Sequence, residues 1–77
     1  MLIAHTISER ACGDGLQVRV DGCLVASVIC DHGLWTCINV GVGCRRVYPS
    51  RVEACAVARR IGRLLVAGEA TTKRIAA

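Results

Sequence analysis

Hydrophobic and polar residues follow one another along the first half of the chain in a pattern that predicts β-strands. Residues 16–20 alternate strictly, which is typical of a strand with one face exposed to solvent. Residues 23–30 form an unbroken apolar run, which indicates a strand that is covered on both faces. Residues 34–40 alternate again, and residues 44–48 predict a short edge segment. Together these runs predict an antiparallel meander with the fully apolar strand in its middle.

Turn sequences between these runs support the meander. Asp21-Gly22 is the dipeptide most typical of a two-residue type I′ hairpin turn. Asp31-His32-Gly33 predicts a second turn, and Gly41-Val42-Gly43 predicts a third. At the N-terminal end, residues 2–7 predict a short strand, whereas the polar, glycine-punctuated segment 8–15 is typical of a loop.

A helix with a clear start follows the strands. Ser50 predicts the N-cap, because its hydroxyl can accept a hydrogen bond from the Glu53 amide while the Glu53 carboxylate reaches back to the Ser50 amide. Gly68 predicts the end of the helix, and we expect residues 68–77 to form a frayed tail. At helical spacing, one face of residues 51–67 collects the apolar residues Ala54, Val57, Ala58, Ile61, Leu64 and Leu65.

The predicted elements define a fold class. We expect residues 1–77 to form a single small α+β domain, in which an antiparallel sheet of three to four strands is packed by one long C-terminal helix. One helix covers only one face of a sheet, yet the strand over residues 23–30 is apolar on both faces. The uncovered face therefore predicts a second partner surface, supplied by another copy of the chain or by another protein.

Composition strengthens the expectation of a partner. The chain is 53% hydrophobic but contains no Phe, one Trp and one Tyr, so its core must be built from aliphatic side chains and cysteine. In only 77 residues, such a core favours oligomerisation or docking onto a larger protein. The formal net charge is +4 and most of the cations are arginine, which permits contact with an acidic protein or a nucleic acid.

No segment of the sequence predicts a membrane or secretory role. The N-terminal residues lack a basic region followed by a long apolar stretch, and no unbroken apolar run is long enough to span a bilayer. We therefore expect no membrane association and a cytoplasmic location.

The sequence offers few residues for catalysis or metal binding. In an intracellular protein, the six cysteines are expected to be buried free thiols, with structural disulfides as the alternative. Cys30 and His32 flank Asp31, which raises the question of a metal site or an activated thiol, but an ordinary turn histidine is favoured because no C-x2-C pair accompanies them. Turn formation explains the aspartates near glycines. We expect no enzymatic activity, no cofactor and no bound metal.

The arginines admit two interpretations. The arginines in question are Arg45, Arg46, Arg51, Arg59, Arg60 and Arg63. Three of them, Arg59, Arg60 and Arg63, lie opposite the apolar face of the predicted helix. As a nucleic-acid footprint, these side chains would contact phosphates. As a solvated helix face, they would keep an apolar helix soluble.

The order of three antiparallel strands and a capped helix, over residues 16–67, resembles the AP2-type and integrase arm-binding DNA-binding domains. The motifs that carry this resemblance are Gly33-Leu34-Trp35, Tyr48-Pro49-Ser50 and Glu53-Ala54. The resemblance implies DNA binding by a sheet laid in the major groove, with the helix packed behind it. The residues here that would contact the groove are Gln17, Arg19, Trp35 and Asn39.

In size and in its lack of a catalytic constellation, the chain is also similar to small bacteriophage proteins that disable host machinery, such as anti-CRISPR proteins. This resemblance implies stoichiometric blockage of a larger protein or protein–nucleic acid complex in the host cytoplasm. We therefore expect a non-enzymatic protein-binding module that also forms a homodimer. The expected apolar docking residues are Val25, Ile29, Trp35 and Cys37, and the expected charged ones are Arg45, Arg46, Arg59, Arg60 and Arg63.

Overall fold

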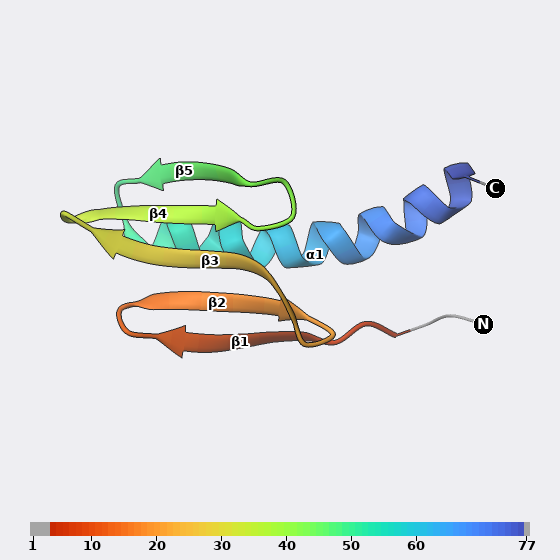
Figure 1. The fold of residues 1–77 in the computed structure, drawn as a ribbon, viewed down its shortest axis with the longest axis horizontal. Helices are drawn as coiled ribbons and strands as arrows, with labels where there is room; N and C mark the ends of the chain where they lie inside the picture. The colour runs from red at the N-terminus through yellow and green to blue at the C-terminus, as the bar shows by residue number, and fades with distance from the viewer. Residues whose placement is uncertain (1–3, 77) are drawn as a thin grey trace.

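The computed structural model describes residues 4–76, with side chains described as far as residue 68. Its elements are β1 (Ile7–Cys12), β2 (Gly15–Val20), β3 (Cys23–Asp31), β4 (Leu34–Asn39), β5 (Cys44–Tyr48) and α1 (Arg51–Ala76). The strands form one antiparallel sheet in the order β1-β2-β3-β4-β5, with α1 lying across one face (Figure 1). The α+β class and the single C-terminal helix are confirmed, but the sheet has five strands rather than three to four.

The additional strand is β1, which occupies most of the segment predicted to be a loop. Every residue of β1 is exposed, so no alternation of buried and exposed residues marks this segment as a strand in the sequence. Only its pairing with β2 makes it part of the sheet. Gly13 has a φ of 58° and opens the two-residue turn into β2, as a type II′ hairpin requires. The strand predicted over residues 2–7 is wrong for residues 4–6, which are not extended in the sheet, and residues 2–3 lie outside the described residues.

The next two turns form as predicted. Asp21 and Gly22 have φ values of 52° and 83°, the pair of positive angles that defines a type I′ turn. His32 and Gly33 repeat this geometry with 51° and 76°. These tight turns fix the register on both sides of β3, and therefore decide which face each side chain of the sheet occupies.

Helix α1 starts where the capping sequence predicts and ends later than expected. The Glu53 amide donates to the Ser50 hydroxyl oxygen over 3.2 Å, and the Ala54 amide donates to the Ser50 carbonyl over 3.2 Å. The helix runs through Gly68 to Ala76, so the predicted end at Gly68 is wrong. Gly68 lacks the positive φ that a C-terminal glycine cap adopts, and a glycine inside a helix permits a stop without forcing one.

The core is a single layer between α1 and the helix-facing side of the sheet. Its buried members are Leu16, Val18, Ala26, Val28, Cys37, Ala54, Cys55 and Ala58. The helix side of this layer is built from small residues, and a Cβ placed on Gly62 would lie 3.0 Å from a methyl of Val18. The backbone of α1 therefore approaches the sheet closely.

The apolar face of α1 extends beyond the part of the helix that the sheet covers. Leu64 and Leu65 were expected in the buried face, but they are 56% and 41% exposed. Figure 1 shows the reason: α1 continues well past the ends of the strands. The sequence periodicity identifies the apolar face of the helix correctly, but it contains no information about where the sheet stops covering that face.

Candidate functional site

The face of the sheet turned away from α1, here called the open face, is the main candidate surface. Its residues follow from strict alternation with the buried ones, because Leu16 and Val18 face the helix and Gln17 between them does not. Because paired residues lie on the same face of a sheet, the strand pairing then identifies the open-face residues of all five strands. One row of the open face consists of residues in direct register: Arg10, Gln17, Ser27, Ile38 and Arg45.

An apolar cluster lies beside this row, made of Ile29, Leu34, Ile38 and Val47. Ile29 and Val47 flank Thr36 in register across β3, β4 and β5, and Leu34 begins β4, two residues before Thr36. Ile29, Leu34 and Val47 are 43%, 50% and 58% exposed, although hydrophobic side chains of this size are usually covered in a small domain. No described part of the chain packs over them, because α1 occupies the other side of the sheet. Part of the exposed apolar surface of the chain is therefore located on the open face, while other exposed apolar side chains, such as Val52 and Leu64, lie on α1.

The apolar docking residues expected from the sequence do not lie together. Ile29 is on the open face, whereas Val25, Trp35 and Cys37 are on the helix side and pack into or against the core. Expecting one face to hold all four was wrong. Val25 changes side because β3 carries an extra residue at this point: Val18 pairs with Ala26, but the next residue of β2 pairs with Leu24.

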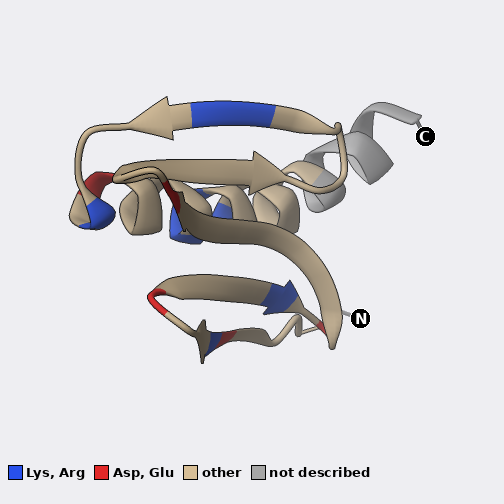
Figure 2. Cartoon of the chain, turned by 60° about the vertical axis from the view of Figure 1, so that its left-hand side comes forward, with Lys and Arg blue, Asp and Glu red and all other residues tan. Residues whose placement is uncertain are grey.

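The arginines also separate into different environments (Figure 2). The Arg59 Nε donates to both carboxylate oxygens of Glu9 over 3.0 Å, and the Arg51 Nε donates to the Asp14 carbonyl over 2.9 Å. These two side chains therefore attach the β1–β2 hairpin to the helix.

The other predicted arginines point in three directions. Arg60 and Arg63 are exposed on the helix, Arg45 is on the open face, and Arg46 is on the helix side of β5. Arg10 and Arg19 join Arg45 on the open face. Arg10 was missed because its segment was predicted to be a loop.

The polar groups near Cys30 lie at an exposed turn. His32 Nε2 lies 3.4 Å from Asp31 Oδ1 at an exposed turn, and the described residues contain no group of three or more potential metal ligands. Cys37 and Cys55 are buried, and burial together with the nearby Cys55 raises the pKa of the Cys37 thiol, which keeps it protonated. The expectation of buried thiols was wrong for the other four, which are exposed free cysteines: Cys12, Cys23, Cys30 and Cys44.

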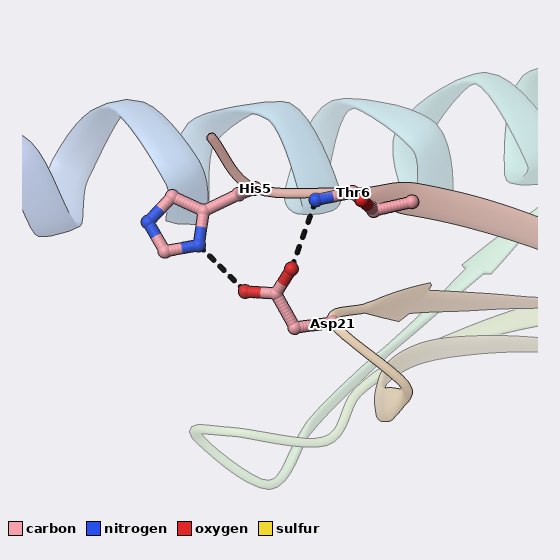
Figure 3. Close-up of polar contacts among 3 residues, drawn as sticks. All are labelled: His5, Thr6 and Asp21. Atoms are coloured by element: carbon pink, nitrogen blue, oxygen red, sulfur yellow. Dashed lines mark hydrogen bonds and ion pairs between the residues drawn. The ribbon is translucent and has the colours of Figure 1, made fainter. Parts of the chain in front are cut away.

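The segment preceding β1 is fastened to the turn between β2 and β3 (Figure 3). His5 Nδ1 lies 2.6 Å from one carboxylate oxygen of Asp21, and the Thr6 amide donates to the other over 2.9 Å. The Asp21 amide donates in return to the Thr6 carbonyl over 2.8 Å. The hydrogen bond from His5, followed by that from Thr6, lowers the pKa of Asp21. These contacts hold residues 4–6 beside the sheet edge, away from the apolar cluster.

Comparison with known proteins does not extend this description: no family model, no curated protein and no solved structure matches the chain. Within the part of the chain that the structure describes, no helix has the length and apolarity needed to cross a membrane.

Proposed function

We propose that the protein is a non-enzymatic binding module that docks onto a larger protein through the open face. The observation that carries this proposal is the apolar cluster of Ile29, Leu34, Ile38 and Val47, in which Ile29, Leu34 and Val47 are exposed and Ile38 is half-buried. Contiguous exposed apolar surface in a small domain is typical of interaction sites. In a phage-type inhibitor, such a face would act by occupying a functional surface of a host complex in a one-to-one ratio.

Charge indicates what kind of partner fits. The open face carries Arg45 beside the cluster and Arg10 and Arg19 on the neighbouring strands β1 and β2, with Asp31 as its acidic residue. A complementary surface therefore has an apolar centre and carboxylates at its rim. A second copy of the chain would bring three more arginines to the same interface. The homodimer expected from the sequence thus remains the alternative occupant, and an acidic partner is the better match.

The test compares the open face with an equally apolar position elsewhere. A photo-crosslinking amino acid is introduced at position 47 or, as the control, at position 52, and each variant is expressed in the native cell. A protein that crosslinks to the variant at position 47 and not to the variant at position 52 is then purified. Titration should then give a one-to-one complex that Ile29→Ser with Val47→Ser weakens at least about tenfold. Val52→Ser, at an exposed valine on α1, should leave the affinity unchanged.

Two outcomes would reject this assignment. If both serine variants weaken the complex equally, the open face is not the docking surface. If sedimentation shows a dimer that the open-face double variant dissolves, the occupant is a second copy.

A second candidate function, duplex DNA binding, is favoured by the row of residues in register. Five strands spaced about 4.8 Å apart place Arg10 and Arg45 at opposite edges of the sheet, roughly 19 Å apart. That span suits phosphates on both sides of a major groove about 12 Å wide. Gln17 and Arg19 lie between them and are of the types that hydrogen-bond to adenine and guanine edges. Trp35 and Asn39 lie on the helix side and drop out of this candidate set.

Salt dependence tests this alternative directly. If a short DNA duplex binds the open face, fluorescence anisotropy at several salt concentrations should give a slope that Arg10→Gln with Arg45→Gln reduces by about two. Arg60→Gln with Arg63→Gln on the helix is the matched control and should leave the slope unchanged. Absence of binding at low salt, or an equal effect of the two pairs, would exclude DNA binding by this face.

A further inference from the structure

The outer edge of β5 is open for pairing with a further strand. β5 is the last strand of the sheet, so one of its edges pairs with β4, and no strand of the described chain pairs with the other. A strand in this position presents a row of backbone N–H and C=O groups without partners. An extended peptide can add to such a row through main-chain hydrogen bonds. Because β1 forms the opposite edge of the sheet, side chains must decide which edge is used.

Charge distinguishes the two edges. β5 carries Arg45 on the open face and Arg46 on the helix side, and both are exposed (Figure 2). Its five residues include no acidic side chain. In β1, by contrast, Glu9 stands beside Arg10, and the Glu9 carboxylate accepts hydrogen bonds from Arg59. An acidic strand would therefore meet positive charge on both sides of β5 and mixed charge along β1.

The same arginines disfavour a second copy of the chain at this edge. Two β5 strands that pair antiparallel about a two-fold axis bring identical surfaces together. In the register that pairs all five residues of β5, Arg46 of one copy would stand directly opposite Arg46 of the other. Like charges in this position are destabilising. The edge therefore selects a strand of different sequence, with carboxylates where β5 has arginines.

Both sides of β5 also offer apolar surface to an added strand. On the open face, Val47 is 58% exposed. On the helix side, α1 packs mainly across β2, β3 and β4 (Figure 1), which leaves Tyr48 beside a hollow that Val57 and Ile61 line. Successive side chains of a strand point to opposite faces, so neighbouring residues of an added strand would cover Val47 and Tyr48 in turn. Apolar residues therefore fit the edge at these two positions.

We propose that the outer edge of β5 binds an extended acidic segment of another protein by β-strand addition. The segment runs antiparallel to β5, as neighbouring strands do throughout this sheet. Two adjacent carboxylates stand opposite Arg45 and Arg46, and apolar residues stand opposite Val47 and Tyr48. Main-chain hydrogen bonds supply most of the affinity, because exposed ion pairs contribute little, and the arginines supply selectivity. This site goes beyond the docking function of the open face, because the segment lies beside the sheet and pairs with its backbone.

The first experiment titrates a synthetic peptide into the isotopically labelled full chain and follows the binding by NMR. The probe is acetyl-Thr-Leu-Val-Glu-Glu-Leu-Thr-amide, for which we expect saturable amide shifts within Cys44–Tyr48 and a dissociation constant of about 1 mM or lower. A peptide in which lysine replaces both glutamates should bind at least about tenfold more weakly. Absence of saturable shifts, equal binding of the two peptides, or equal shifts within β1 would overturn the proposal.

Methylation of the peptide backbone tests strand addition itself. Methyl groups on the amide nitrogens of the second, fourth and sixth residues occupy one edge of the extended peptide, and those on the third, fifth and seventh residues occupy the other. Only one of these edges can face β5. One methylated peptide should therefore bind at least about tenfold more weakly, while the other stays within about threefold of the parent peptide. An equal effect of the two sets would show that the peptide does not bind as a strand.

Substitutions in the protein separate this edge from the open face. Arg45→Gln with Arg46→Gln should weaken peptide binding about fivefold. Arg60→Gln with Arg63→Gln makes the same change in net charge on α1 and should weaken it less than about twofold. Ile29→Ser, two strands from the edge, should leave peptide binding unchanged whether or not it weakens docking through the open face. Equal effects of the two arginine pairs, or a loss of peptide binding in Ile29→Ser, would reject the edge as the site.

Discussion

Replacing Gly15 by alanine should be among the most destabilising single changes in this fold. Gly15 begins β2, where the backbone of β3 comes so close that a Cβ on residue 15 would lie 1.8 Å from the carbonyl oxygen of Val28. An ordinary contact between carbon and oxygen needs about 3.3 Å, so the two strands would have to separate by roughly 1.5 Å. The obstructing atom belongs to the backbone, and no rotamer change can relieve the clash.

The cost can be set against the total stability of the domain. Overpacking of this severity costs about 3 kcal/mol, while the lower entropy of the unfolded alanine chain returns at most about 1 kcal/mol. The net loss of about 2–3 kcal/mol is a large part of the roughly 4–12 kcal/mol expected for 77 residues. With a urea dependence of about 1 kcal/mol per molar, the unfolding midpoint should fall by about 2–3 M.

Urea unfolding followed by the fluorescence of Trp35 measures this shift. Gly41→Ala is the control, because a Cβ there meets its nearest atom at 3.7 Å, which is an ordinary contact. Its midpoint should stay close to that of the unsubstituted protein. A Gly15→Ala midpoint within about 0.5 M of the original, or an equal loss in Gly41→Ala, would refute the close approach of β2 and β3.

Three further predictions address the core, the edge strand and the N-terminal contact. Val28→Ala should lower the free energy of unfolding by about 2–3 kcal/mol in urea titrations, and the exposed Val47→Ala by less than about 0.5 kcal/mol, because only Val28 is buried. Glu9→Gln should cost less than about 1 kcal/mol, since its ion pair is largely exposed, yet it should speed amide hydrogen exchange within β1. The folded-state pKa of Asp21 is lowered by His5, so its contribution to stability is present above the ordinary value of 3.8 and is lost as the pH falls through the lower folded value. Asp21→Asn should flatten that part of the acid unfolding profile, and an unchanged profile would contradict the contact with His5.

Local chemistry allowed most of the fold to be predicted. The turns at Asp21 and His32 and the start of the helix at Ser50 depend on a few adjacent residues, and each forms as expected. β1 was missed because a strand whose side chains are all exposed needs no hydrophobic pattern, so only its partner strand reveals it. The end of α1 was missed for a related reason: a single glycine is compatible with both a cap and a continuing helix.

The candidate site was harder to predict because it depends on side-chain direction. Val25 and Ile29 are four residues apart on one strand, so alternation places them on the same face. The extra residue in β3 reverses this relation and turns Val25 toward the core. Arg59 appeared available for binding, yet it is engaged by Glu9, a residue fifty positions away. Neither the bulge nor this ion pair has a signal in the sequence, because each arises from contacts between distant segments.

The strand β5 shows why the two sides of the sheet can be separated experimentally. Arg45 and Arg46 are adjacent in sequence and were both expected among the charged docking residues. In register, Arg45 lies beside Ile38 on the open face, whereas Arg46 lies beside Cys37 on the helix side. A substitution at one position therefore alters one surface and leaves the other intact, while both produce the same change in net charge. If docking responds equally to either substitution, the long-range electrostatic field of the protein is acting, and the open face cannot be assigned as a specific site.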